Sequence, residues 1–422
     1  MLSPEDNERL VRVGPGTPAG RMFRRYWLPA LLASEIPEPD CAPVRVRILG
    51  EDLIAFRDSS GRPALVDAFC AHRRAPLFFG RNEADGLRCV YHGWKFDLTG
   101  ACVDMPSEPA TSNMKSRIRL TAYPAVERGG VIWTYMGPPA SRPEPPDYEW
   151  TRAPEPHRHV SKTLEHCNYL QALEGGLDTT HSSFVHNNRL GDKTQLRQRD
   201  TAPRLDVEPT DYGYYYVSHR KAGADGFYVR VYQYVMPSQQ MRGAVGALRE
   251  ERDLPRLDGH IWVPIDDEHT HVYNWMCGYD RTVSFSEAFR DEAESYFGRG
   301  KDDLIPGTFA LRKSLANDYE VDRGKQKTQT YTGITGINTQ DFALQEGMGP
   351  IVDRSQENLG SSDKAIVTMR RLMLEAVAAV ERGEDPRGLD PASYRGVRPH
   401  DGLVPPEADW REVFGKELEA KW

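Results

Sequence analysis

The sequence predicts an α+β protein, with a small all-β module before a proline-rich linker and a sheet carrying a helix after it. Three observations support this fold class: the linker over residues 137–146, short strand-like runs upstream, and aromatic strand-like runs with one long helical stripe downstream. Proline fixes φ and lacks an N–H, so the linker should be extended and lie outside any sheet. We therefore expect two domains, residues 1–140 and 141–422.

The N-terminal module should consist of short strands separated by turns. Residues 44–49 begin with alternating apolar and polar side chains, residues 53–56 follow a turn over residues 50–52, and residues 131–135 are apolar and aromatic. Short runs bounded by turn residues are typical of small all-β modules.

The C-terminal part mixes strands and helices. Residues 212–218 and 227–235 are rich in aromatic and β-branched side chains, which favour strands. Residues 361–382 place their apolar side chains on one helical stripe, and residues 164–186 also have a helical pattern. These elements predict an α+β domain whose sheet carries a helix.

The composition excludes some classes of function. With 54 Lys and Arg against 62 Asp and Glu, the net charge of -8 argues against a nucleic-acid partner. The N-terminus has no basic stretch followed by an apolar run, and no apolar stretch is long enough to span a bilayer, so we expect a cytoplasmic protein. The six cysteines are scattered, which favours a Cys/His metal site over a disulfide framework.

Two cysteines and two histidines form the first candidate site. Cys70-Ala71-His72 is followed, after sixteen residues, by Cys89-Val90-Tyr91-His92. These ligands could hold one structural zinc ion, or a Rieske [2Fe-2S] cluster with two Cys on one iron and two His on the other. Because each half supplies one Cys and one His at a loop tip, the pairing favours the cluster. Gly80 and residues 92–96 would supply tight backbone and apolar cover.

A second candidate site has the spacing Asp178-x2-His181-x4-His186. Two histidines and a distant carboxylate form the facial triad of non-haem Fe(II) oxygenases, which leaves positions open for dioxygen. Asp178 and His181 would share a helix face, whereas a π-bulge or a break between two helices would bring His181 and His186 together. Chemistry alone leaves the third ligand open, with Glu346, Asp353 and Glu320 among the possibilities.

The signature segments resemble those of a known family. Residues 69–73 and 88–97 resemble the Rieske signature of aromatic ring-hydroxylating oxygenases, with Ala71 where that family usually has proline. Further segments are similar to the phthalate dioxygenase-like branch, namely residues 13–18, 24–30, 80–83, 104–109, 317–319 and 345–354. The resemblance implies an N-terminal Rieske domain, a helix-grip catalytic domain with an antiparallel sheet and helices, and a homotrimer or a stacked pair of trimers.

The resemblance also implies a role for each site residue. Residues 337–346 resemble the segment that donates the third iron ligand, and the matching residue is Asp341. Asp178 would bridge His181 to a Rieske histidine of a neighbouring chain, because a carboxylate between two imidazoles shortens the electron path. The cluster ligands would be Cys70, His72, Cys89 and His92, and the mononuclear Fe(II) ligands His181, His186 and Asp341.

The function that these features predict is that of a terminal oxygenase in aromatic catabolism. It would dihydroxylate an aromatic carboxylate or, alternatively, O-demethylate a lignin-derived methoxyaromatic acid. A Rieske electron carrier without chemistry of its own is the alternative from another class, but it leaves residues 178–186 and the C-terminal domain unexplained. Iron content separates the two, at about three atoms per chain for the oxygenase and about two for the carrier.

Electrons should come from a separate protein. The chain has no G-x-G-x-x-G after a strand and no C-x4-C-x2-C run, so we expect a separate NAD(P)H-dependent reductase or ferredoxin as partner. The sequence assigns no substrate-binding residue. Candidates for the pocket wall are Tyr214, Tyr216, Tyr228, Tyr232 and Tyr234, and candidates for gripping a carboxylate are Arg230 and Arg242.

Overall fold

The computed structural model describes residues 1–192, 194–243, 254 and 256–422. They form two compact units, residues 13–146 and residues 1–12 together with 147–422. The first twelve residues thus group with the second unit, whereas a division at 140/141 would place them with the first. Within the described ranges, no helix is long and apolar enough to cross a membrane.

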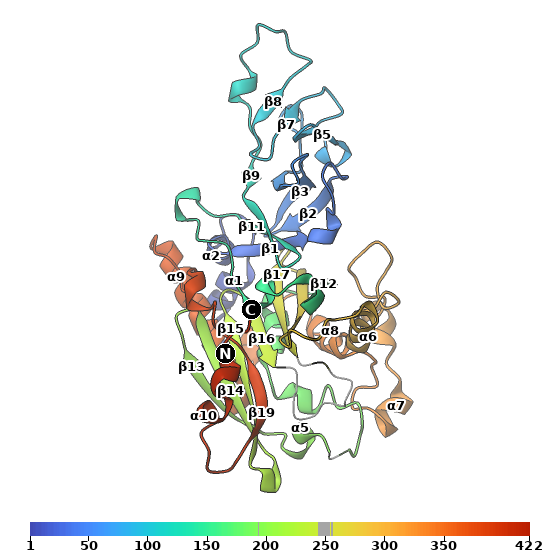
Figure 1. Cartoon of the computed structure of the whole chain (residues 1–422), viewed down its shortest axis with the longest axis vertical. Helices are drawn as coiled ribbons and strands as arrows, with labels where there is room; N and C mark the ends of the chain where they lie inside the picture. The colour runs from blue at the N-terminus through green and yellow to red at the C-terminus, as the bar shows by residue number, and fades with distance from the viewer. Residues whose placement is uncertain (193, 244–253, 255) are drawn as a thin grey trace. The chain divides into compact units, whose positions relative to one another are not determined.

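The unit of residues 13–146, whose first strands are drawn in blue in Figure 1, contains three small antiparallel sheets. Their strand orders are β1-β11-β10, β2-β3-β4-β9 and β5-β6-β7-β8. One short helix, α2 (Pro18–Phe23), precedes them. The strands are β1 (Trp27–Leu32), β2 (Val44–Ile48), β3 (Glu51–Arg57), β4 (Pro63–Asp67), β5 (Arg81–Glu83), β6 (Gly86–Arg88), β7 (Lys95–Phe96), β8 (Cys102–Asp104), β9 (Ala122–Tyr123), β10 (Ala125–Arg128) and β11 (Val131–Tyr135).

The predicted strands of this unit are present, but the first turn is displaced. Strand β11 has the predicted bounds, and β2 and β3 form the predicted hairpin. The turn lies at Leu49 and Gly50, with φ of 50° and 76°, because Glu51 and Asp52 already pair with β2. The predicted turn over residues 50–52 was therefore placed too late. The proline-rich linker contains no strand, and its extended course is interrupted by a 3₁₀ turn, Pro139–Ser141.

The other unit is built on one antiparallel sheet of eight strands, in the order β12-β18-β17-β16-β15-β14-β13, with β19 pairing with β15. Strand β15 has the bounds predicted from the sequence, and β14 extends the predicted strand at its C-terminal end. The strands are β12 (Arg158–Glu165), β13 (Arg204–Pro209), β14 (Gly213–Lys221), β15 (Phe227–Val235), β16 (Gln239–Gly243), β17 (Arg256–Pro264), β18 (Thr270–Gly278) and β19 (His400–Val404).

Helices accompany this sheet, and one of them carries Asp341 of the second site. The predicted helix over residues 361–382 is confirmed as α9, preceded by a 3₁₀ turn at Ser361–Asp363. The described helices are α1 (Pro4–Val11), α3 (Glu149–Arg152), α4 (Tyr169–Leu177), α5 (Leu196–Arg199), α6 (Glu287–Phe297), α7 (Arg323–Thr328), α8 (Ile337–Gly347), α9 (Lys364–Glu381) and α10 (Trp410–Phe414). The all-β module followed by an antiparallel sheet with helices confirms the predicted fold class.

Candidate functional site

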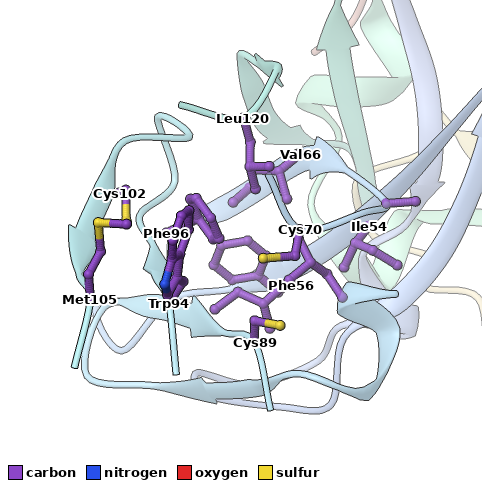
Figure 2. Packing of buried hydrophobic residues seen from close by; sticks show 14 residues of the cluster. Ile54, Phe56, Val66, Cys70, Cys89, Trp94, Phe96, Cys102, Met105 and Leu120 are labelled. Carbon is purple, nitrogen blue, oxygen red and sulfur yellow. The ribbon is translucent and has the colours of Figure 1, made fainter. Parts of the chain in front are cut away.

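The Cys/His site lies at the tips of two loops in the unit of residues 13–146. Cys70 follows β4 and Cys89 follows β6, and both thiols are buried in an apolar cluster that includes Phe56 and Trp94 (Figure 2). The imidazole rings of His72 and His92 face each other edge to face, with centroids 4.5 Å apart. The structure therefore brings together all four residues that the sequence singled out.

Local backbone geometry shapes the second of these loops. The Cys89 N–H donates to the carbonyl of Trp94, and the Gly93 N–H donates back to the carbonyl of Cys89. Gly93 has φ of 78°, a conformation that glycine adopts at little cost, and this turn reverses the chain direction after His92. The Trp94 ring then stacks on His72 at 4.4 Å, so the predicted apolar cover comes chiefly from this residue.

The donor atoms fit an iron–sulfur cluster. The Nδ1 atoms of His72 and His92 are both buried, and neither has a hydrogen-bond partner in the part of the chain that the structure describes. A buried polar atom without a partner is costly, and a metal ion bound there would remove that cost. Burial raises the pKa of the Cys70 thiol to about 11, so a thiolate at this position needs a cation beside it.

The second site begins where a helix breaks. Helix α4 starts at the Asn168 cap and ends at Leu177, and a 3₁₀ turn, His181–Ser183, follows. The predicted break is confirmed. The expectation that Asp178 and His181 share a helix face is wrong, because Asp178 has extended backbone angles. Its Oδ1 accepts from the Thr180 N–H at 2.6 Å and its Oδ2 from the His181 N–H at 3.2 Å, which holds the connecting turn.

Three ligand atoms from distant segments converge at this break. The Nε2 atoms of His181 and His186 are 3.1 Å apart, and Asp341 Oδ1 lies 3.6 Å and 3.3 Å from them, respectively. Their ligand atoms all lie within 4.8 Å of one another, close enough to hold a single metal ion. Two imidazoles and a carboxylate suit a mononuclear Fe(II) centre.

The other carboxylates considered from the sequence lie outside this group. Glu346 instead accepts hydrogen bonds from the Tyr319 hydroxyl and from the His166 N–H, so its oxygens are engaged elsewhere. Asp341 is therefore the third ligand.

A glutamine fixes the ring of His186. The Nδ1–H of His186 donates to Gln340 Oε1 at 2.9 Å, and the Gln340 amide nitrogen donates to Asn188 Oδ1 and to the Ile334 carbonyl, both at 2.8 Å. Because these two acceptors fix the amide, Oε1 must face the histidine, and Nε2 of His186 is left as the metal-binding lone pair. Burial lowers the pKa of His186 to about 4, which also keeps the ring neutral.

A second chain of contacts orients Asp341. Asn338 Nδ2 lies 3.5 Å from Asp341 Oδ2, and Arg299 donates to Asn338 Oδ1 at 2.8 Å. Arg299 in turn forms a buried ion pair with Glu294. Sequence reasoning missed both Asn338 and Gln340. The available signal was their position in the first turn of α8, beside Asp341.

Asp178 approaches His181 on the side away from the other ligands. Its Oδ2 lies 3.6 Å from His181 Nδ1, a buried atom that has no hydrogen-bond partner in the described chain. Burial alone would raise the pKa of Asp178, but His181 and two backbone N–H groups outweigh it and lower that pKa. The carboxylate is therefore charged and close to an iron ligand.

A cavity of about 850 Å³ adjoins the iron ligands. Residues that pair directly across antiparallel strands share a face of the sheet, and one face of strands β15 to β18 lines this cavity. Of the five candidate tyrosines, Tyr232 lines it, and the other four do not. The side chains that this face contributes are Arg230, Tyr232, Gln240, Arg242, Arg256, Asp258, His260, Trp262 and Val272.

A buried Cys/His loop pair and a two-histidine, one-carboxylate centre in one chain define an iron oxygenase that carries its own iron–sulfur module. Two family descriptions match the chain: "Rieske [2Fe-2S] domain" over residues 26–124 and "LigXa C-terminal domain like" over residues 134–421.

Relatives of nearly full length agree with these matches. The phthalate 4,5-dioxygenase oxygenase subunit of Pseudomonas putida is 40% identical, covering 98% of this chain and 94% of the relative. The 3-chlorobenzoate-3,4-dioxygenase oxygenase subunit of Comamonas testosteroni is 36% identical over 99% of each. The 5,5'-dehydrodivanillate O-demethylase oxygenase subunit of a Sphingobium species is 36% identical, covering 94% and 86%.

Solved structures share the fold. Dicamba monooxygenase bound to dicamba superposes with a TM-score of 0.61 at 20% identity, covering 86% of this chain and 99% of that one. The chain belongs to the Rieske-type aromatic oxygenases, as an oxygenase (alpha) subunit. The predicted family is confirmed, and membership rules out both the zinc site and the electron carrier as alternatives.

Membership also settles the cofactors. They are a Rieske [2Fe-2S] cluster and a mononuclear iron at His181, His186 and Asp341. As one subunit of an oxygenase system, the chain takes electrons from a reductase or ferredoxin partner.

Proposed function

We propose that this oxygenase dihydroxylates the ring of an aromatic carboxylate. The observation that carries this proposal is a set of three cavity-lining arginines, Arg197, Arg230 and Arg242, none of which has an ion-pair partner among the residues that the structure describes. The names of two relatives, a phthalate dioxygenase and a chlorobenzoate dioxygenase, agree with an acidic aromatic substrate.

The surroundings of Arg242 support a ligand anion as its partner. It lies opposite Asp258 in the sheet, but Arg256 Nε already binds that carboxylate at 3.0 Å. Burial lowers the pKa of Arg242, yet a guanidinium remains charged at neutral pH. Arg242 is half-buried and shares its nearest carboxylate with Arg256, so a ligand carboxylate would offset the cost of desolvating its charge through paired charge-assisted hydrogen bonds.

The rest of the cavity suits an aromatic ring. Trp262, Phe289 and Phe297 supply apolar walls, while Tyr232 has its hydroxyl satisfied by Thr179 at 2.6 Å. These walls would hold the ring beside His181, His186 and Asp341 and exclude bulk water. When bound there, the iron would activate dioxygen with electrons supplied by the cluster.

We also propose the roles of the remaining site residues. Cys70 and Cys89 would bind one cluster iron and His72 and His92 the other, which their burial and the orphaned Nδ1 atoms support. Asp178 would link His181 to His92 of a neighbouring subunit in a homotrimer or a stacked pair of trimers. A carboxylate accepts from two imidazole N–H groups, and Oδ2 already lies near one. The electron donor would be an NAD(P)H-dependent reductase or a ferredoxin.

The substrate proposal is tested by Arg242→Gln in the reconstituted enzyme. Loss of a charge-assisted hydrogen-bond pair should weaken binding of benzoate about 10-fold to 100-fold, while binding of the neutral analogue benzamide changes little. Arg371→Gln is the matched control, because Arg371 is exposed on α9 and pairs with Glu375. An unchanged preference for benzoate over benzamide in Arg242→Gln would refute the assignment. If methoxybenzoates release formaldehyde and no ring diol forms, the reaction is O-demethylation and not dihydroxylation.

A further inference from the structure

The cavity contains one histidine that is not an iron ligand. His260 lies on β17 between Asp258 and Trp262, on the sheet face that lines the cavity, and is 4% exposed. It occupies the strand next to Arg242, two residues beyond the partner of that arginine. Both side chains therefore stand within reach of one small aromatic molecule.

Asn274, on the neighbouring strand β18, fixes the tautomer of His260. His260 Nδ1 lies 2.8 Å from Asn274 Oδ1, across the β17–β18 pair. The amide of Asn274 cannot be reversed without loss, because its Nδ2 donates to Thr163 Oγ1 at 3.3 Å and to the Val272 carbonyl at 3.2 Å. Oδ1 must therefore accept, so Nδ1 of His260 carries the proton and Nε2 has the lone pair.

The surroundings keep His260 in this neutral form. Burial lowers its pKa well below the usual range, and the positive charges of Arg242 and Arg299 lower it further. Within the described chain, the hydrogen bond of this ring is made at Nδ1, so Nε2 is left for a ligand. It therefore presents an acceptor, not a donor, to whatever occupies the cavity. A ligand carboxylate, ether or halogen placed against it would face lone pair with lone pair.

We propose that His260 accepts a hydrogen bond from a ring hydroxyl of the substrate, so that the preferred substrates are aromatic acids with a phenolic O–H. This inference rests on the proposed function, in which the arginines bind the substrate carboxylate. It adds a second polar contact, which determines substrate specificity. A substrate with a donor can hydrogen-bond to this acceptor, whereas one without a donor cannot.

The test measures dissociation constants by anaerobic calorimetry on the holoenzyme. The probes are benzoate, the three hydroxybenzoate isomers and the three corresponding methoxybenzoates. At least one hydroxybenzoate should bind about fivefold more tightly than benzoate and than its own methoxy counterpart. The dissociation constants of phenol and anisole are also compared, which repeats the test on molecules that have no carboxylate.

Two variants separate the acceptor from the bulk of the ring. His260→Asn keeps a donor for Asn274 but removes the atom at the Nε2 position, so the preference for the hydroxyl should fall to less than twofold. His260→Gln places an amide oxygen near that position and should restore part of the preference.

The outcomes distinguish the two proposals. If no hydroxyl is preferred in the wild-type enzyme in either series, or if His260→Asn keeps the full preference, the role of His260 is wrong even when carboxylates bind well. If carboxylates give no advantage but phenol still binds more tightly than anisole in a His260-dependent manner, the carboxylate proposal fails and the role of His260 stands.

Discussion

Replacing Gln340 by leucine should release the mononuclear iron while leaving the Rieske cluster in place. Gln340 is fully buried, and its Oε1 is the acceptor for His186 Nδ1–H. Leucine has a similar size but no acceptor, so the imidazole loses the contact that sets its tautomer and orientation. Losing such an outer contact typically costs about 10-fold to 100-fold in metal affinity.

The cost in folding stability can be worked from the same contacts. Asn188 and Ile334, which accept from the Gln340 amide, are only half-buried, so water can replace the lost donor. His186 Nδ1 is buried and would be left unsatisfied, which costs about 1–3 kcal/mol. We therefore expect a protein that still folds but holds iron poorly.

The assay follows transfer of Fe(II) from the reconstituted enzyme to a coloured chelator, with the Rieske absorption as an internal standard. Thr339→Val is the control, because Thr339 lies in the same turn of α8 and makes only a 3.4 Å contact to the Gly298 carbonyl. Iron retention in Gln340→Leu equal to that of the wild type and of the control would refute the argument that this amide orients His186.

Three further predictions follow from other contacts. His72→Cys should retain an iron–sulfur cluster but lower its reduction potential, since a thiolate stabilises the oxidised state more than neutral imidazole does; an unchanged potential in protein film voltammetry would contradict the Rieske ligation. Asp178→Asn should spare both metal centres and assembly but slow single-turnover oxidation of the pre-reduced cluster, and a wild-type rate would exclude an electron route through this carboxylate. Burial raises the pKa of Glu294, but Arg299 and His159 outweigh it and lower the pKa to about 2, below that of an unfolded glutamate. The ionised Glu294 carboxylate therefore adds roughly 3 kcal/mol to the free energy of unfolding above about pH 5, and this contribution is lost as the pH falls toward 2. Urea titrations should show that Glu294→Gln flattens the dependence of stability on pH over that range.

The metal ligands were predictable because their chemistry demands particular residue types at short spacings. Cys70 with His72, and Cys89 with His92, each lie within one loop, and His181 and His186 are five residues apart. Their convergence needs only one turn or one helix break. Asp341 is far away in sequence, and only its resemblance to a family segment identified it.

The cavity was not predictable, because it depends on which residues share a sheet face and on which partners are already taken. The register of β16 against β17 places Arg242 opposite Asp258, and only the structure shows that Arg256 occupies that carboxylate. Likewise, the aromatic runs predicted β14 and β15, but not that Tyr232 alone of the five tyrosines would line the cavity. The helix over residues 164–186 was overestimated, since the pattern does not reveal that Leu164 belongs to β12.

The most direct test of the central claim is iron content per chain in the reconstituted wild type and in Asp341→Ala. If one chain carries both a Rieske cluster and a mononuclear centre ligated by Asp341, the wild type should hold about three iron atoms and the variant about two, with equal Rieske absorption. A wild type that holds only about two, or an Asp341→Ala variant that keeps about three, would contradict the account.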